Sequence, residues 1–200
     1  MGKPIIAVDI DDVLAAEAAF IVAYSNKRWG HALAVTDYQE FWEAMWDVDH
    51  EEAERRAVEL HQPGIEGSYE PIQGARDALA RLHQKFELVT VTSRRELVRS
   101  ETLDWLKKHL GDVFSRVLFS GIWDGGKRGA HKLTKTEILQ SIGAQFLIDD
   151  QLKHCLSAAE AGINAVLFGD YPWNQSDSLA VRVARCSDWK AVLDYFDGRA

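Results

Sequence analysis

The stretch Ile5-Ile6-Ala7-Val8-Asp9-Ile10-Asp11-Asp12-Val13 decides the fold of this chain. Its apolar start is typical of a buried strand, and an Asp-x-Asp motif follows where that strand ends. Asp9 and Asp11 are two residues apart, so a loop beyond the strand can aim both carboxylates into one cleft. There one carboxylate could attack phosphorus while the other carries a proton. A lone Asp-x-Asp is more often an acidic turn that caps the next helix, and this alternative stays open here.

Short apolar runs alternate with amphipathic stretches along most of the sequence. The strands that we expect are Pro4–Val8, Phe86–Thr92, Val117–Phe119, Phe146–Ile148 and Ala165–Phe168. The helices that we expect are Ala75–Gln84, Glu96–His109, Thr134–Ile142, Leu152–Ala161 and Asp188–Phe196. Wholly apolar strands separated by helices indicate a parallel sheet that is covered on both faces. The pattern therefore predicts an α/β fold, a Rossmann-like three-layer arrangement whose site lies at the carboxyl ends of the strands.

Residues 16–70 interrupt this alternation. They contain no convincing strand, and helices are expected at Glu17–Trp29, Asp37–Trp46 and His50–Leu60. We interpret them as a small helical cap inserted after the first strand, so that residues 1–15 and 71–200 form the core domain. Seven aromatic residues lie early in the cap: Phe20, Tyr24, Trp29, Tyr38, Phe41, Trp42 and Trp46. Most should form the cap's own core, while one or two could face the cleft and stack a nucleobase.

Composition narrows the partners of the protein. The 23 basic and 31 acidic residues give a net charge of −8, and no basic run is long enough to follow a nucleic-acid polymer. No apolar run approaches the roughly 18 residues that a membrane span needs. Cys155 and Cys186 have no metal-binding spacing, which favours buried thiols in a reducing compartment over a disulfide. Because the sequence enters a strand within four residues, we expect no signal peptide and a cytoplasmic protein.

A second strand end carries hydroxyl groups. The run Phe86–Thr92 is followed by Ser93, and free backbone N–H groups and hydroxyls at such a place can hold a phosphate oxygen. Ser93 with Glu96 also fits a Ser-x-x-Glu capping box, and for Ser93 alone that reading is favoured. Thr92 is the better phosphate ligand of the two.

Two further motifs complete the set. Lys132 and Lys135 precede a helix, where a positive charge is unfavourable for the helix dipole and so suggests an anion nearby. Lys135 starts the helical pattern directly and is the better candidate. Asp149 and Asp150 follow the short strand Phe146–Ile148, and hard carboxylate oxygens that converge with Asp9 would suit Mg²⁺. The alternative for Asp150 is an N-cap of the next helix.

In this order, Asp9-x-Asp11-x-Val13, Thr92, Lys135 and Asp149-Asp150 resemble the four motifs of the haloacid dehalogenase-like hydrolases over nearly the whole chain. Within them the sequence is most similar to the 5′(3′)-deoxyribonucleotidases, with further support from Val91–Arg94, Leu147–Asp150 and Phe168–Asn174. Asp12 is a departure, because that position is often Gly in the wider superfamily.

The resemblance implies a role for each motif residue. Asp9 would be the nucleophile and a Mg²⁺ ligand, and Asp11 the general acid and base that also offers its backbone carbonyl to the metal. Thr92, Ser93 and Lys135 would hold the phosphoryl group, although Lys127 and Lys132 are alternatives to Lys135. Asp149 and Asp150 would complete the metal site, and which of them coordinates directly is open.

The resemblance also implies a function. It is Mg²⁺-dependent phosphomonoester hydrolysis through an aspartyl-phosphate, with (deoxy)nucleoside monophosphates as the expected substrates. The alternatives are a phosphatase or phosphomutase for another small phosphometabolite, or a non-catalytic phosphate-binding module. Arg94, Arg95, Lys127 and Arg128 either reach a second phosphate or a ribose, or are simply solvated. The sequence leaves a homodimer open.

Overall fold

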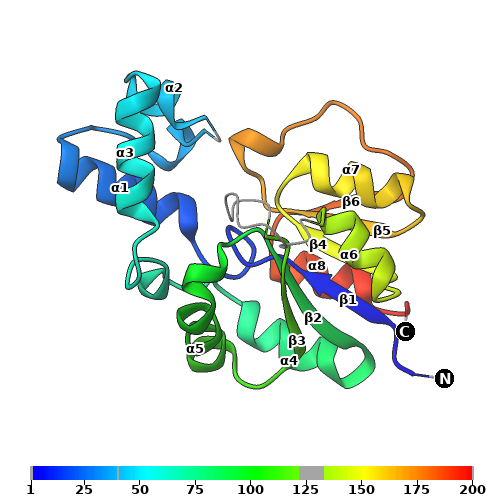
Figure 1. The fold of residues 1–200 in the computed structure, drawn as a ribbon. Coiled ribbons are helices and arrows are strands. Elements are labelled where there is room, and N and C mark those ends of the chain that lie inside the picture. Colours follow the sequence, from blue (N-terminus) through cyan, green and yellow to red (C-terminus); the bar gives the residue numbers. More distant parts are fainter. Residues whose placement is uncertain (1, 40, 122–132, 200) are drawn as a thin grey trace.

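A parallel sheet forms the centre of the molecule. The computed structural model describes residues 2–39, 41–121 and 133–199, and within them a six-stranded sheet runs in the order β3-β2-β1-β4-β5-β6 (Figure 1). The strands are β1 (Ile5–Val8), β2 (Glu87–Thr92), β3 (Phe114–Phe119), β4 (Phe146–Asp149), β5 (Asn164–Phe168) and β6 (Val183–Cys186). Every neighbouring pair is parallel, which confirms the expected sheet type.

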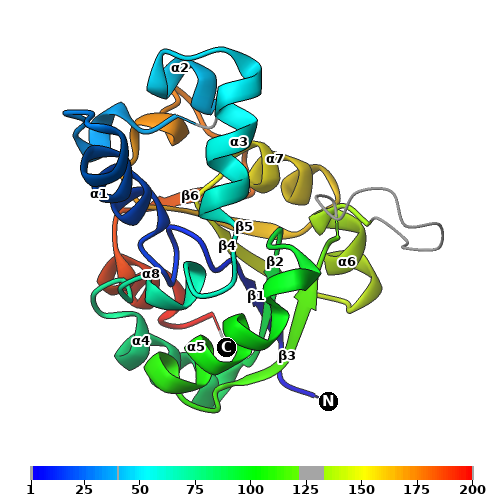
Figure 2. The same cartoon turned by 60° about the vertical axis from the view of Figure 1, so that its left-hand side comes forward.

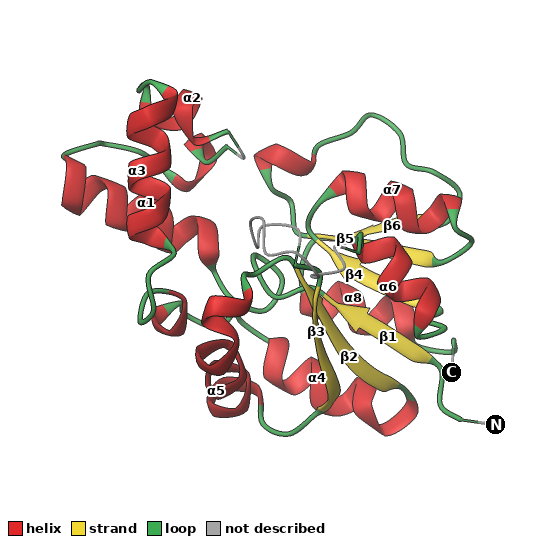
Figure 3. Ribbon diagram, viewed as in Figure 1, coloured by secondary structure: helices red, strands yellow, loops and turns green. Residues whose placement is uncertain are grey.

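Helices cover both faces of the sheet, as Figure 3 shows. One face packs against α4 (Ala75–Lys85), α5 (Arg99–Leu110) and α8 (Trp189–Phe196), and the other packs against α6 (Lys135–Ser141) and α7 (Leu152–Glu160). Along β1 the side chains alternate, so that Ile6 and Val8 enter the first core and Ala7 enters the second. Burial on both faces is the reason that the strands are apolar throughout.

The strand order brings the polar strand ends together. β1 lies between β2 and β4, so Asp9 directly follows the central strand while Thr92 and Asp149 end its two neighbours. Backbone pairing with β4 continues one residue beyond the end of β1, where the Asp9 N–H donates to the Ile148 carbonyl at 2.9 Å. Three motifs far apart in the sequence therefore meet at one edge of the sheet.

Residues 16–70, the segment that the sequence predicts to be a cap, lie beyond that edge (Figures 1 and 2). They form α1 (Glu17–Trp29), α2 (Trp42–Trp46), α3 (His50–Leu60) and the short 3-10 turns Val35–Asp37 and Glu66–Ser68. Their apolar side chains make a core of their own around Trp46, Ile21 and Leu60. The division into two domains stays a prediction.

The two connections between this segment and the sheet run side by side. Ala15 and Pro71 form an antiparallel bridge. The Ala16 N–H donates to the Glu70 carbonyl at 2.9 Å, and the Ile72 N–H donates to the Leu14 carbonyl at 2.7 Å. The entry and the exit of the segment are thus tied to each other.

Two local predictions were wrong. The helix expected at Asp37–Trp46 is interrupted, because Tyr38 and Phe41 have extended backbone and Tyr38 packs edge-on against Trp173, 4.9 Å between ring centroids. The strand β6 has no counterpart among the predicted strands. It is a four-residue strand at the edge of the sheet, paired on one side with β5.

Other predictions hold in the structure. The helices at Glu17–Trp29 and His50–Leu60 have the predicted bounds. Cys155 and Cys186 are buried free thiols. Within residues 2–39, 41–121 and 133–199, no helix combines the length and apolar character needed to cross a bilayer.

Candidate active site

A buried lysine joins two of the strand-end carboxylates. Lys135 Nζ lies 2.7 Å from Asp9 Oδ2 and 2.8 Å from Asp149 Oδ2, and each of the three side chains is at most 7% exposed. Lys135 is the first residue of α6, behind a capping box made by Thr134 and Glu137. The two carboxylates offset the unfavourable place of its charge at a helix start. The anion expected near this lysine is therefore present as protein carboxylate.

The charges at this place shift the pKa of each group. Burial raises the pKa of Asp9 to about 6, the charges of Asp149 and Asp11 add to the rise, and Lys135 partly offsets it. For Asp149, burial is outweighed by Lys135 and His154, so its pKa is lowered. Burial alone would lower the pKa of Lys135, but the two carboxylates raise it. At neutral pH the lysine is charged and Asp149 is ionised, with Asp9 ionised just above its own pKa.

Asp9, Asp149 and Asp150 could together hold a cation. Each offers one carboxylate oxygen, and these oxygens lie within 4.8 Å of one another. Asp9 Oδ1 is buried and, among the described residues, has no hydrogen-bond partner. A converging set of hard oxygens with one orphaned buried oxygen fits Mg²⁺, a hard cation that takes oxygen ligands. The three residues therefore fit the predicted ion.

Asp150 is held by an aromatic segment after β5. Trp173 Nε1 donates to Asp150 Oδ2 at 2.7 Å, and Gln151 Nε2 donates to the same oxygen at 3.0 Å. Asn174 Nδ2 donates to the Asp150 backbone carbonyl at 3.0 Å. The N-cap alternative for Asp150 is wrong, because Gln151 occupies the N-cap position of α7 and accepts no capping hydrogen bond.

Asp11 does not join this carboxylate cluster; its side chain pairs with Arg94. Arg94 Nη2 donates to Asp11 Oδ1 at 2.6 Å. The Arg94 side chain is 2% exposed, so the alternative that Arg94 is simply solvated is wrong. The alternative that it reaches the substrate stays a prediction. Sequence reasoning missed this pair because 83 residues separate its members. The expected coordination of metal by the Asp11 carbonyl stays a prediction.

The backbone at Asp12 accounts for the aspartate at a position that is often glycine in the wider superfamily. Its φ of 53° lies in the left-handed region that glycine favours and that aspartate tolerates better than most residues. Both carboxylate oxygens accept the Ala18 N–H, at 3.1 and 3.2 Å, in the first turn of α1. Burial raises the pKa of Asp12 to about 8 against the effect of that hydrogen bond. The helix-capping role considered for the acidic motif thus belongs to Asp12.

The two hydroxyl residues occupy different places. Thr92 is fully buried, and its Oγ1 accepts the Arg94 N–H at 3.1 Å. Ser93 lines the cavity described below, and its buried Oγ has no hydrogen-bond partner among the described residues. The capping alternative for Ser93 is wrong, because the helical turn starts at Glu96 with Arg95 before it. Both hydroxyls therefore stay predicted phosphate ligands: Thr92 Oγ1 still has its own hydrogen to donate, and Ser93 Oγ has no partner among the described residues.

These groups open into a cavity of about 350 Å³ between the sheet edge and the helical segment. Its lining includes Asp9, Asp11, Ser93, Lys135 and Asp150 from the predicted set. From the helical segment, Tyr38, Trp42 and His61 also line it, with the Trp42 and His61 rings stacked at 5.6 Å. The other lining residues are Asp12, Glu17, Ala57, Glu66, Arg94, Arg95, Gln151, Lys153 and His154.

The aromatic residues of the segment divide as predicted. Phe20, Tyr24, Trp29 and Trp46 belong to its core, and Tyr38 and Trp42 both pack there and line the cavity. Phe41 is an exception, since it is 74% exposed.

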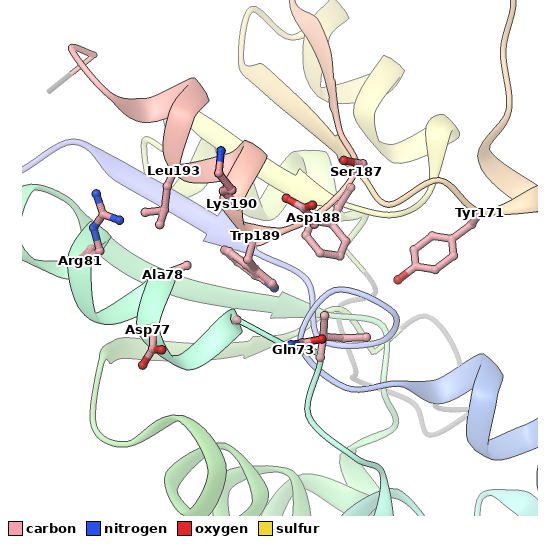
Figure 4. Close-up of a pocket in the computed structure, with 13 residues that line it drawn as sticks. Gln73, Asp77, Ala78, Arg81, Tyr171, Ser187, Asp188, Trp189, Lys190 and Leu193 are labelled. Carbon is pink, nitrogen blue, oxygen red and sulfur yellow. The ribbon is translucent and has the colours of Figure 1, made fainter.

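A second hollow, of about 560 Å³, lies between α4 and α8 (Figure 4). Asp77, Arg81, Asp188 and Lys190 lie around it, and Tyr171 stands at one end. Among the described residues, none of the predicted site residues lines it. The smaller cavity is therefore the candidate active site.

Some predicted residues cannot be placed, and some contacts were not foreseen. Lys127, Arg128 and Lys132 lie outside the described residues. His154 Nδ1 lies 3.2 Å from Asp149 Oδ1, a contact that its place in the first turn of α7 could have suggested. Trp173 belongs to the Phe168–Asn174 motif, but nothing in the sequence assigns its indole N–H to Asp150.

Comparisons with known proteins agree with this geometry. Among solved structures, the haloacid dehalogenase-like family hydrolase SP0104 from Streptococcus pneumoniae is 17% identical, with a TM-score of 0.68 over 97% of this chain and 98% of that chain. The HAD-hydrolase YfnB from Bacillus subtilis, solved with bound magnesium, is 16% identical, with a TM-score of 0.65 over 98% of this chain and all of that chain. A predicted phosphatase from Clostridium acetobutylicum is 17% identical, with a TM-score of 0.65 over 97% of this chain and all of that chain. These likenesses show the fold.

The sequence itself shows the family. No curated protein matched the chain. Residues 3–121, more than half of the 200, match the family described as 5′ nucleotidase, deoxy (pyrimidine), cytosolic type C protein. The chain therefore belongs to that family, and it is a haloacid dehalogenase-like hydrolase of the phosphatase and nucleotidase type.

Proposed function

We propose that the protein hydrolyses phosphomonoesters through an aspartyl-phosphate on Asp9, with Mg²⁺ as its cofactor. The observation that carries the proposal is the Asp9 carboxylate. Lys135 holds one of its oxygens, while the other is buried without a hydrogen-bond partner among the described residues. A carboxylate that is held in place, is ionised at neutral pH and has one oxygen without a hydrogen-bond partner is suited to covalent catalysis.

Each named side chain has a part in two displacements. In the first, an Asp9 oxygen bonds to phosphorus, the ester P–O bond breaks, and Asp11 gives its proton to the leaving oxygen. In the second, water attacks the phosphorus, Asp11 takes the proton of that water, and Asp9 is released with inorganic phosphate. Lys135 and Ser93 would hold the phosphoryl oxygens. Thr92 would support the loop that contains Ser93, because its Oγ1 accepts the Arg94 N–H.

The metal would be held by Asp9, Asp149 and Asp150, together with the Asp11 backbone carbonyl that the family resemblance implies. When bound, Mg²⁺ would neutralise charge on the phosphoryl oxygens. Asp150 would be kept in place for this by Trp173, and Asp149 by Lys135 and His154.

For the substrate we propose a (deoxy)nucleoside monophosphate. The family description supports it, and so do the rings of Tyr38, Trp42 and His61, which line the same cavity as the carboxylates. Aromatic faces accept a base by stacking, worth about 1–3 kcal/mol per base.

A second candidate substrate is a sugar phosphate. Glu17 and Glu66 also line the cavity, and two carboxylates can accept hydrogen bonds from several hydroxyl groups. A phosphomutase acting on such a compound would release little inorganic phosphate, so product analysis separates the two reactions.

The test is inorganic phosphate release from nucleoside, deoxynucleoside and sugar monophosphates, with Mg²⁺ and with EDTA. Asp9→Asn keeps the shape of the nucleophile and removes its charge, and Asp104→Asn makes the same change on the exposed face of α5. We expect Mg²⁺-dependent turnover of deoxynucleotides that is lost in Asp9→Asn and kept in Asp104→Asn. Undiminished turnover by Asp9→Asn would contradict the mechanism. Turnover of sugar phosphates alone would contradict the nucleotide substrate and favour a sugar phosphate in its place.

A further inference from the structure

Arg94 places three hydrogen bonds on the carboxylate of Asp11. Its Nε lies 3.0 Å from Oδ1 and 3.1 Å from Oδ2, and its Nη2 lies 2.6 Å from Oδ1. The rigid, planar fork of an arginine fixes both the position and the plane of a carboxylate, which a lysine cannot do.

The guanidinium group has further contacts besides those with Asp11. Its Nη1 donates to Thr102 Oγ1 at 3.2 Å, and its Nε lies 3.3 Å from Glu66 Oε2. Its central carbon lies 5.4 Å from the centre of the Tyr69 ring. These partners come from α5 and from the end of the helical segment, so they clamp Arg94 between the two parts of the chain. A group clamped in this way transmits a single orientation to Asp11.

Asp11 needs such an orienting partner. It lies in a loop beyond β1, and its side chain is 20% exposed, so part of the carboxyl group is open to a ligand in the cavity. A general acid must come within hydrogen-bond reach of the leaving oxygen, roughly 2.6–3.2 Å. A misplacement of about 1 Å can cost about 100-fold in rate.

We propose that Arg94 is a positioning residue, which acts through Asp11 by holding its carboxyl group toward the leaving oxygen of the substrate. The inference rests on the proposed function. It predicts a dependence on the leaving group, because only a substrate whose leaving oxygen needs a proton depends on a well-placed acid. A direct role of Arg94 in binding phosphate would affect all substrates alike.

The test compares kcat/KM for phenyl phosphate and p-nitrophenyl phosphate, two substrates of similar shape. Phenolate is the poorer leaving group and needs the proton more. For Arg94→Gln we expect a loss of about 10- to 100-fold on phenyl phosphate and of less than about 3-fold on p-nitrophenyl phosphate. Because kcat/KM reports the steps up to the first irreversible one, the later attack of water does not obscure the comparison.

Two further variants keep the test decisive if Arg94→Gln folds poorly. Arg94→Lys retains the charge without the fork, and Thr102→Val removes one partner of the guanidinium group. Both should show the same selective loss on phenyl phosphate, smaller in Thr102→Val. Arg99→Gln is the matched control, because Arg99 pairs with Glu96 on the surface at 2.5 Å. It should leave the ratio of the two substrates unchanged.

The outcomes separate this inference from the proposed function. An equal loss on both substrates, or an unchanged ratio in all three variants at positions 94 and 102, would overturn the positioning role and leave the hydrolase intact. Absence of Mg²⁺-dependent phosphate release by the wild type on every phosphate tried would overturn the proposed function and the positioning role with it. In an Asp11→Asn background, Arg94→Gln should cause no further selective loss.

Discussion

Replacing Lys135 by methionine tests the electrostatic centre of the site. Methionine keeps most of the volume of the side chain and removes its charge. The ammonium group lies 2.7 Å from Asp9 and 2.8 Å from Asp149, and an effective dielectric constant of about 20 gives about 6 kcal/mol of attraction for each contact. The cost of burying the charges offsets much of this attraction in the intact protein.

Removing only the cation leaves two buried carboxylates without their shared partner. Breaking a buried ion pair from one side costs about 3–5 kcal/mol. For a protein of this size, that loss lowers the melting temperature by roughly 6–20 °C. We also expect Asp9 to become protonated at neutral pH, because burial and Asp149 raise its pKa and Lys135 no longer opposes them. Activity should fall with the loss of the ionised nucleophile.

Urea unfolding with EDTA and with Mg²⁺ measures the effect. Mg²⁺ should stabilise Lys135→Met more than the wild type, because the ion then supplies the missing positive charge and binding to the folded state adds stability. The control is Lys190→Met, which breaks a lysine–aspartate pair of the same 2.8 Å length on the surface. That pair is 83% and 62% exposed, so its loss should change stability little. Equal destabilisation by the two substitutions would refute the reasoning.

Two other predictions concern groups around the cavity. Trp173→Phe removes the indole N–H that Asp150 accepts, so we expect weaker Mg²⁺ binding by calorimetry; Trp29→Phe is the control, because the Trp29 N–H is buried without a partner among the described residues. Equal Mg²⁺ affinity in both variants would contradict the role of Trp173. Burial raises the pKa of Glu66 from 4.5 to about 7, so between these values the folded state binds more protons and wild-type stability falls as pH rises. Glu66→Gln lacks this loss and should gain up to about 3 kcal/mol relative to the wild type across that window; a difference independent of pH in urea unfolding would show that Glu66 titrates normally.

The central strand and its neighbours could be predicted because each is a short apolar run that is visible in the local sequence. Ile5–Val8 is apolar on both faces, and a carboxylate directly follows it, so a buried strand and the place of Asp9 at its end follow from one stretch. The parallel pairing follows from the helices that separate this strand from the other apolar strands. The strand β6 gave a weaker signal, since four residues that include Arg185 pair with the sheet from one side.

The contacts that shape the site could not be predicted from the sequence. Arg94 stands beside Arg95 in a polar stretch, and both line the cavity, but only the fold shows that Arg94 is buried and paired with Asp11. Which of Thr92 and Ser93 contacts a phosphate stays a prediction, because the direction of a side chain at a strand end depends on how the next turn leaves the sheet. Local pattern thus identifies the residues, and tertiary packing decides which of them face a ligand.

The paired connections at Ala15 and Pro71 have a consequence for how this protein can vary. The two ends of the 16–70 segment are hydrogen-bonded to each other. The segment therefore leaves the core and returns to it at one place, as a hairpin loop does. Loop-closure entropy grows slowly, by about 0.6 kcal/mol for each doubling of length. The middle of the segment could therefore be shortened, enlarged or exchanged if Ala18, Glu66 and Tyr69 are kept, because these residues near its two ends contact Asp12 and Arg94. That middle part is the natural unit for grafting new substrate preferences onto an unchanged core.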